Sequence, residues 1–68
     1  MDILKTFGEN LRKTRKKVGF SQEKLAEKTG LHRTYISFLE RGLRNPTLTT
    51  IYKLSVELDI NITDLFEN

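Results

Sequence analysis

The chain is 68 residues long and contains one histidine and no cysteine. This length suits one domain with one apolar core, and it excludes a catalytic domain with a large enclosed pocket. The missing cysteines exclude disulfides and zinc-finger sites, and His32 alone cannot build a metal site, so we expect no metal and no cofactor. A fold below about 70–80 residues that lacks disulfides and a metal site needs close helix packing or a partner chain.

Charge is distributed unevenly along the chain. Residues 1–44 hold 11 Lys and Arg against 5 Asp and Glu, whereas residues 45–68 hold 1 against 4. One end therefore carries a field that attracts phosphate groups, although an uneven solvated surface is an equal alternative. No apolar run approaches the roughly 20 residues that span a bilayer, and residues 1–10 lack the apolar segment of a signal peptide. We expect a soluble cytoplasmic protein with no membrane partner.

Apolar residues recur at helical spacings, and no period-two pattern typical of a strand lasts five residues. The first predicted helix covers residues 3–18, and its apolar face consists of Leu4, Phe7, Leu11 and Val18. Gly8 lies inside this helix, where a glycine costs about 1 kcal/mol relative to alanine, so we expect a weak point there. Gly19 provides a left-handed C-cap.

Two short helices follow, at residues 22–28 and 33–41. Ser21 is the expected N-cap of the first, and Gly30 lies in the turn between them, where a positive φ is needed. Ala26 lies where the two helices approach each other, and the angle between them is filled by Leu25, Ile36 and Leu39. This spacing over residues 22–41 is typical of a helix-turn-helix, whose second helix enters the major groove of DNA.

The loop of residues 43–46 leads to a fourth helix, predicted at residues 48–58 and capped by Thr47. The apolar face of this helix consists of Leu48, Ile51, Leu54 and Leu58. A short fifth helix is predicted at residues 62–66.

The segment SQEKLAEKTGLHRTYISFLERGLRNPTLTTIYKLSVELDI, with the ending ITDLF, resembles the DNA-binding domain of the Cro/CI (XRE-type) regulator family. The resemblance covers residues 7–66. It implies an all-α, five-helix, lambda-repressor-like DNA-binding domain formed by residues 1–68, with the helix-turn-helix proper at 22–41. Within the family, HRTYISFLERGLRNPTL looks most like the controller proteins of bacterial restriction–modification systems. His32 stands where many relatives carry Ser or Asp, which predicts weak N-capping of the third helix.

The outer face of the third helix is the candidate DNA-reading surface, because Arg33, Thr34 and Ser37 lie opposite its apolar residues. Arginine can bond both O6 and N7 of guanine, and threonine can bond a base edge or touch a thymine methyl group. The resemblance places Arg33 and Thr34 at base-reading positions. An ordinary solvated helix surface is the alternative for these residues.

Two aromatic residues and a loop arginine each have more than one interpretation. Tyr35 contacts DNA, as the matching tyrosine does in controller proteins, or packs its ring on the second helix. Phe38 touches a thymine methyl group or rests against the loop. Arg44 reaches a base, as the resemblance to controller proteins implies, or grips the DNA backbone, or serves the turn before Pro46.

Contacts to DNA phosphates are expected from Gln22, Asn45 and Thr49. The amide of Gln22 and the free N–H groups at the start of the second helix suit a phosphate oxygen, and the resemblance supports this role. Turn chemistry before Pro46 is a strong alternative for Asn45.

The resemblance has two further structural implications. Arg15 and Glu40 match the family's internal ion pair, which would tie the first helix to the third. Part of the apolar group at the acidic end must fill the monomer core, and the rest would form a homodimer interface through the fifth helix. This group consists of Ile60, Ile62, Leu65 and Phe66.

These observations predict a sequence-specific transcriptional regulator, bound as a homodimer to a near-palindromic operator in double-stranded DNA. RNA polymerase is a further expected partner if the bound dimer activates transcription. A restriction–modification controller, a prophage repressor and a chromosomal repressor all fit. An antitoxin-like protein-interaction module is the alternative from another class, and Arg33, Arg41 and Arg44 argue against it. An enzyme is not expected, because Asp59 and Asp64 have no partner base, nucleophile or metal ligand.

Overall fold

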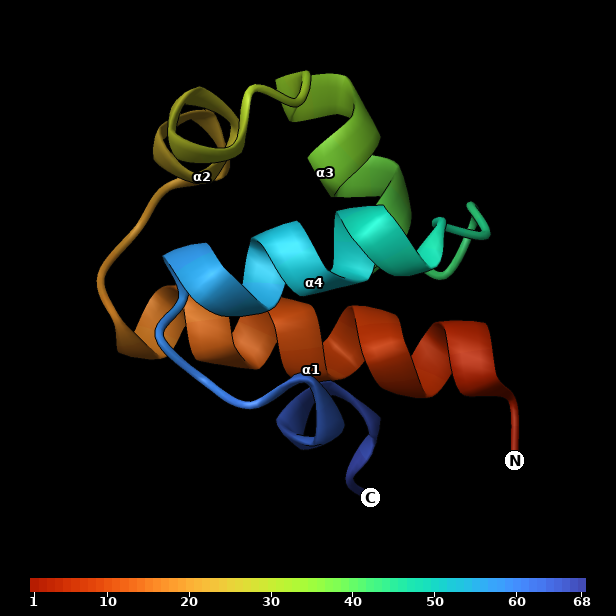
Figure 1. Cartoon of the computed structure of the whole chain (residues 1–68). Helices are drawn as coiled ribbons and strands as arrows, with labels where there is room; N and C mark the ends of the chain where they lie inside the picture. The colour runs from red at the N-terminus through yellow and green to blue at the C-terminus, as the bar shows by residue number, and fades with distance from the viewer.

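The computed structural model describes all residues from Met1 to Asn68 and contains four α-helices, one 3₁₀ helix and no strand. The α-helices are α1 (Ile3–Lys17), α2 (Gln22–Thr29), α3 (Arg33–Glu40) and α4 (Leu48–Glu57), and the chain closes with the 3₁₀ helix η1 (Ile62–Phe66) (Figure 1). The prediction of helices over residues 3–18, 22–28, 33–41 and 48–58 is confirmed, and each predicted end lies within one residue of the observed end. None of these helices combines the length and the apolar character that crossing a membrane requires.

The predicted short fifth helix is a 3₁₀ helix of five residues rather than an α-helix. The Asn61 N–H donates to Asp64 Oδ2 at 3.0 Å, and the Asp64 N–H returns a bond to the Asn61 carbonyl at 3.0 Å. Five residues allow few i→i+4 bonds, so this tighter winding suits the short segment. The five-helix prediction is therefore met by four α-helices and one 3₁₀ helix, and this last helix has the predicted bounds.

Side-chain caps mark the starts of α2 and α4. The hydroxyl groups of Ser21 and Thr47 accept backbone N–H bonds from Lys24 and Thr50, at 2.9 and 3.1 Å, which confirms both predicted N-caps. The His32 side chain makes no such bond at the start of α3, which confirms the predicted weak N-capping of this helix.

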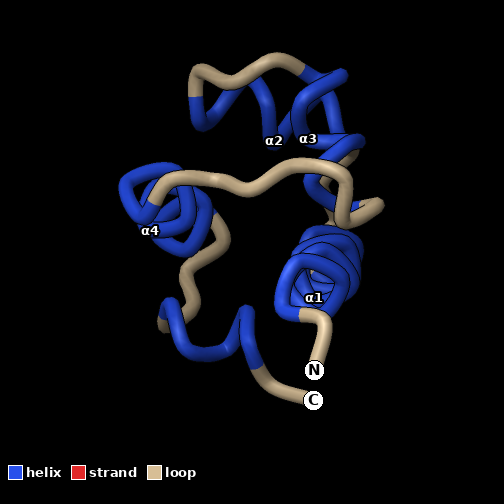
Figure 2. Tube along the Cα trace, turned by 90° about the vertical axis from the view of Figure 1, so that its right-hand side faces the viewer, coloured by secondary structure: helices blue, strands red, loops and turns tan.

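One apolar cluster lies between all five elements. Figure 2 shows α1 and α4 on opposite sides of this core, with α2 and α3 covering one end and η1 the other. The cluster consists of nine buried residues: Phe7, Leu11, Leu25, Ala26, Ile36, Leu39, Leu54, Leu58 and Leu65. The helix-turn-helix thus lies on the far side of the core from η1.

The end of α3 approaches α1 closely at Gly8. A Cβ added to Gly8 would lie 2.4 Å from the Leu39 carbonyl oxygen and 2.7 Å from that of Glu40. Helix propensity alone led us to expect that Gly8 weakens α1. This contact corrects that expectation, because the close packing requires a glycine. The absence of a side chain lets the end of α3 rest directly on α1.

We predict that Gly8→Ala destabilises the protein although alanine is the better helix former. The propensity gain is about 1 kcal/mol, whereas forcing a methyl group into a packed backbone contact costs typically 1–3 kcal/mol or more. Chemical denaturation of wild type and variant would measure the difference. Gly19→Ala is the comparison, because nothing lies within 4 Å of its added Cβ and only the positive φ of 84° opposes it. A Gly8→Ala variant as stable as wild type would contradict the close approach.

Candidate nucleic-acid interface

The turn between α2 and α3 sets the angle at which α3 projects. Gly30 adopts φ 74°, and an added Cβ there would meet no atom within 4 Å, so its conformation rather than its size is required. Leu25, Ile36 and Leu39 are completely buried in the angle between the helices, and Ala26 is 6% exposed. The helix-turn-helix geometry predicted for residues 22–41 is therefore present in the structure.

The outer face of α3 is open to solvent at its start. Arg33 and Thr34 are exposed, and Ser37 is half-buried. The Arg33 Nε lies 3.9 Å from Glu23 Oε1, with both side chains largely in solvent. A surface pair of this kind contributes little free energy, so the guanidinium of Arg33 can exchange this carboxylate for another acceptor.

The two aromatic residues of α3 are only partly available. Tyr35 is half-buried and packs against the core, which favours the packing interpretation of its ring. Phe38 is half-buried beside the loop after α3, with the guanidinium carbons of Arg44 and Arg41 at 5.1 and 5.9 Å from its ring centre. This arrangement favours the interpretation that Phe38 rests against the loop.

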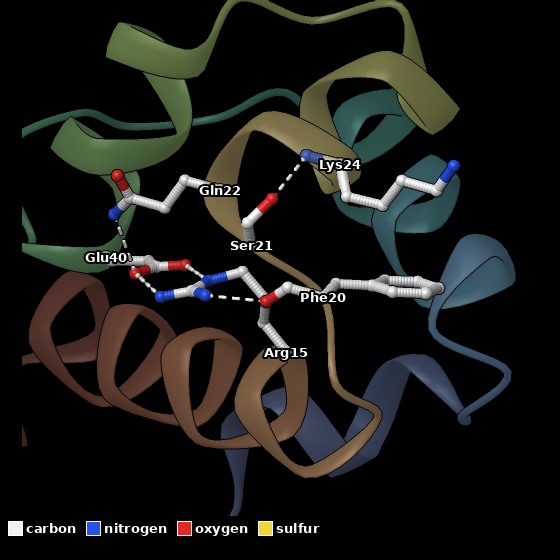
Figure 3. A network of polar contacts seen from close by, with 6 residues as sticks. All are labelled: Arg15, Phe20, Ser21, Gln22, Lys24 and Glu40. Carbon is white, nitrogen blue, oxygen red and sulfur yellow. Dashed lines mark hydrogen bonds and ion pairs between the residues drawn. The ribbon is translucent and has the colours of Figure 1, made fainter.

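The residues proposed for phosphate contact differ in their surroundings. Asn45 and Thr49 are exposed, as is the loop residue Arg44. Gln22, by contrast, is half-buried, and its Nε2 donates to Glu40 Oε1 at 3.1 Å (Figure 3). The sequence offered no signal for this contact, because it depends on how α2 meets α3.

Glu40 accepts at the same time from a buried arginine. Arg15 donates from Nε to Glu40 Oε2 at 2.6 Å and from Nη2 to Oε1 at 3.1 Å, and from Nη1 to the Phe20 carbonyl at 2.7 Å. The side chains of Arg15 and Glu40 are 8% and 2% exposed. Figure 3 shows these contacts meeting between α1, α2 and α3. The network adds polar contacts between the helix-turn-helix and α1 to those of the apolar core.

The apolar group at the acidic end divides between the core and the surface. Leu65 is completely buried, and the ring of the half-buried Phe66 lies 5.7 Å from that of Phe7, so both residues pack within the monomer. Leu65 and Phe66 are therefore members of the group that contribute to the monomer core, as part of the group was expected to do. Ile60 and Ile62 remain half-buried beside a surface hollow of about 440 Å³.

Two residues of α4 complete that hollow and were missed as interface candidates. Tyr52 and Val56 line it, and they are 61% and 53% exposed. Their spacing of four residues on α4 was the available signal. We call Tyr52, Val56, Ile60 and Ile62 the α4 apolar face.

Comparison with known proteins agrees with this geometry. The profile of the helix-turn-helix family HTH_3 matches residues 11–65. The chain is 48% identical over 62 residues to the control protein C.BamHI of Bacillus amyloliquefaciens, covering 90% of this chain and 76% of that protein. The crystal structure of the restriction–modification controller protein C.AhdI from Aeromonas hydrophila matches with a TM-score of 0.89 and 48% identity, over 93% of this chain and 96% of the other. The biofilm regulator SinR in complex with DNA matches with a TM-score of 0.84 and 35% identity, over 90% and 98%.

Proposed function

The chain belongs to the helix-turn-helix family HTH_3, and we propose on that premise that it is a sequence-specific transcriptional regulator that binds a near-palindromic operator as a homodimer. The observation that carries this proposal is the pair of exposed side chains, Arg33 and Thr34, at the start of a helix propped outward by buried residues. Residues 1–68 then act as one DNA-binding unit of lambda-repressor-like arrangement. The unit acts by binding and not by catalysis.

Base reading falls to the exposed part of α3 and the loop that follows. Arg33 donates to a guanine edge, while Thr34 and Ser37 bond or touch neighbouring base edges. Arg44 extends the contact from the loop. Tyr35 contributes only its hydroxyl group, at the edge of this surface, because its ring packs against the core.

Phosphate contacts hold α3 in register along the groove. Asn45 and Thr49 are free to donate or accept at the DNA backbone, since neither is buried. The Gln22 amide carries two N–H donors, and one of them is bonded to Glu40. The second remains for a phosphate oxygen near the start of α2, so DNA contact and the internal network do not compete.

The α4 apolar face supplies the homodimer contact in this proposal. Tyr52 and Val56 expose more than half of their surface, and a face of this kind is most simply covered by the same face of a second copy. Two recognition helices would then lie about 34 Å apart, one turn of DNA, which matches a near-palindromic site.

Similarity to C.BamHI and C.AhdI favours a restriction–modification controller as the biological role. Such a protein would repress by covering a promoter or activate by touching RNA polymerase. A chromosomal repressor is the second candidate, since the chain also matches SinR, a master regulator for biofilm formation, in complex with DNA. Methyltransferase and endonuclease genes beside this one would decide for the controller.

The proposal is tested by selecting bound duplexes from a randomised DNA pool and titrating the best site at several salt concentrations. We expect a near-palindromic site, with affinity that falls steeply as salt rises because phosphate contacts release counterions. Binding with no sequence preference would contradict the proposal.

We predict that Arg33→Ala weakens operator binding and relaxes the preference at one base pair in each half-site. Loss of a bidentate guanine contact costs about 1–3 kcal/mol, or about 5- to 150-fold per half-site. Lys13→Ala is the matched control, because Lys13 lines a surface hollow with Asp64 and Glu67, on the η1 side of the molecule. Equal losses of operator affinity for both variants would mean that Arg33 contributes only a general electrostatic attraction to DNA.

A further inference from the structure

Phe38 is the one aromatic side chain that bears two arginine guanidinium groups. Arg44 lies 5.1 Å and Arg41 5.9 Å from the centre of its ring, both within the distance at which a cation is attracted to an aromatic face. Phe38 lies one helical turn beyond Thr34, on the same side of α3 as the exposed reading surface. Both arginines are themselves exposed.

The backbone after α3 is fixed by a tight reversal. The Gly42 N–H donates to the Leu39 carbonyl at 3.1 Å and the Leu43 N–H to the Phe38 carbonyl at 2.9 Å, with Gly42 at φ 72°. This pair of bonds is the Schellman pattern, which brings the residue after the glycine back beside the last helical turn. Leu43, Phe38 and Arg44 accordingly line one surface hollow. This reversal therefore fixes the backbone position of Arg44, and only the orientation of its side chain remains to be determined by other contacts.

Neither Arg41 nor Arg44 pairs with a carboxylate, since the salt bridges of the chain involve only Arg15, Lys24 and Arg33 as cations. A free arginine side chain loses up to about 2 kcal/mol of rotamer entropy when it becomes fixed on a ligand. A carboxylate partner would restrict the side chain but neutralise it. An aromatic ring restricts it and leaves its full charge for an anion.

We infer that Phe38 is a positioning residue, which holds Arg44, and more loosely Arg41, ready to donate to DNA beyond the end of α3. The inference rests on the proposed function, since DNA is the ligand it serves. Arg44 and Arg41 bind acceptors of the nucleic acid directly, and Phe38 acts through them. The Phe38 side chain is half-buried and lines one surface hollow with Leu43 and Arg44, which leaves part of it available for this role.

The first test needs no DNA. In the free protein, the ring current of Phe38 should shift the side-chain proton resonances of Arg44 upfield, and Phe38→Leu should remove this shift. Phe38→Trp should keep it, because an indole face attracts a cation at least as well. Arg44 resonances at random-coil positions in wild type would overturn the inference even if DNA binding occurs.

The second test is a double-mutant cycle on the selected operator, with melting temperatures measured alongside. Phe38→Leu should weaken binding about 2- to 5-fold per half-site, the range of an exposed cation–aromatic contact, and Phe38→Trp should restore it. In an Arg41→Gln/Arg44→Gln background, Phe38→Leu should change nothing further. Equal losses in both backgrounds would mean that the ring itself touches DNA, and would overturn the positioning role.

The salt dependence of Arg44→Gln separates the two kinds of acceptor. A lost phosphate contact weakens all sequences alike and reduces the salt slope by about 1, whereas a lost base contact relaxes one position of the site. Either result supports the inference, and an Arg44→Gln variant that binds as wild type overturns it. Absence of any specific site for the wild-type protein would instead contradict the proposed function.

Discussion

Replacing Glu40 by leucine is expected to lower the free energy of unfolding by about 3–5 kcal/mol, because Arg15 would keep its charge in a site that excludes water. Arg15 is 8% exposed, and it would retain only its bond to the Phe20 carbonyl. A chain of 68 residues has a total stability of about 3–10 kcal/mol, at roughly 0.05–0.15 kcal/mol per residue. The single substitution therefore brings the protein close to unfolding at room temperature, and urea denaturation followed by circular dichroism measures the loss.

The double variant Arg15→Met/Glu40→Leu separates a charge effect from a packing effect. Removing both charges leaves no unpaired ion, and well-packed apolar replacements of a buried pair are often neutral. We expect the double variant to regain most of the lost stability, but not all, because the Phe20 carbonyl loses its donor. A double variant that is less stable than Glu40→Leu alone would show that packing, and not the unpaired charge, causes the loss.

The helices could be predicted because each carries its own local signals. Ser21 and Thr47 are caps that act within their own first turn, and the positive φ of Gly30 follows from its place between two short helices. Such features depend on neighbours in sequence, so pattern and propensity are sufficient to find them. The positions of the buried residues of α2 and α3 follow for the same reason.

Contacts between elements escaped prediction where they depend on distances that the sequence does not encode locally. Helix propensity alone predicts a weak point at Gly8, and the closeness of Gly8 to the Leu39 and Glu40 carbonyls appears only when α3 packs on α1. The bond from Gln22 to Glu40 joins residues 18 positions apart. The two arginines over Phe38 depend on a backbone reversal whose hydrogen bonds no single residue specifies.

The division of the last apolar group shows the same limit at the surface. Leu65 is completely buried and the Phe66 ring lies against that of Phe7, and a 3₁₀ helix distributes side chains differently from an α-helix. The exposed side chains beside Ile60 and Ile62 are Tyr52 and Val56, which come from α4, an element distant in sequence.

Val56→Asp is expected to convert the proposed dimer into a monomer. In a two-fold interface each substitution occurs twice, and burying a carboxylate without a partner costs several kcal/mol. Dimer association should therefore weaken at least about 100-fold. Residues 45–68 already hold 4 acidic side chains against 1 basic one, which adds repulsion between two such ends. Sedimentation at micromolar concentration measures the change, and operator binding should lose its cooperativity.

Ile3→Asp provides the matched control, because Ile3 is 55% exposed against 53% for Val56 and lies at the start of α1, outside the α4 apolar face. Both variants add one charge and remove one half-exposed aliphatic side chain. The melting temperatures of the two monomers should therefore change little, as is usual for surface substitutions. If Ile3→Asp alone dissociates the dimer, the contact lies at the other end of the molecule. If neither variant alters a dimeric wild type, the α4 apolar face is not the interface, and the spacing of the two recognition helices must be set by another surface.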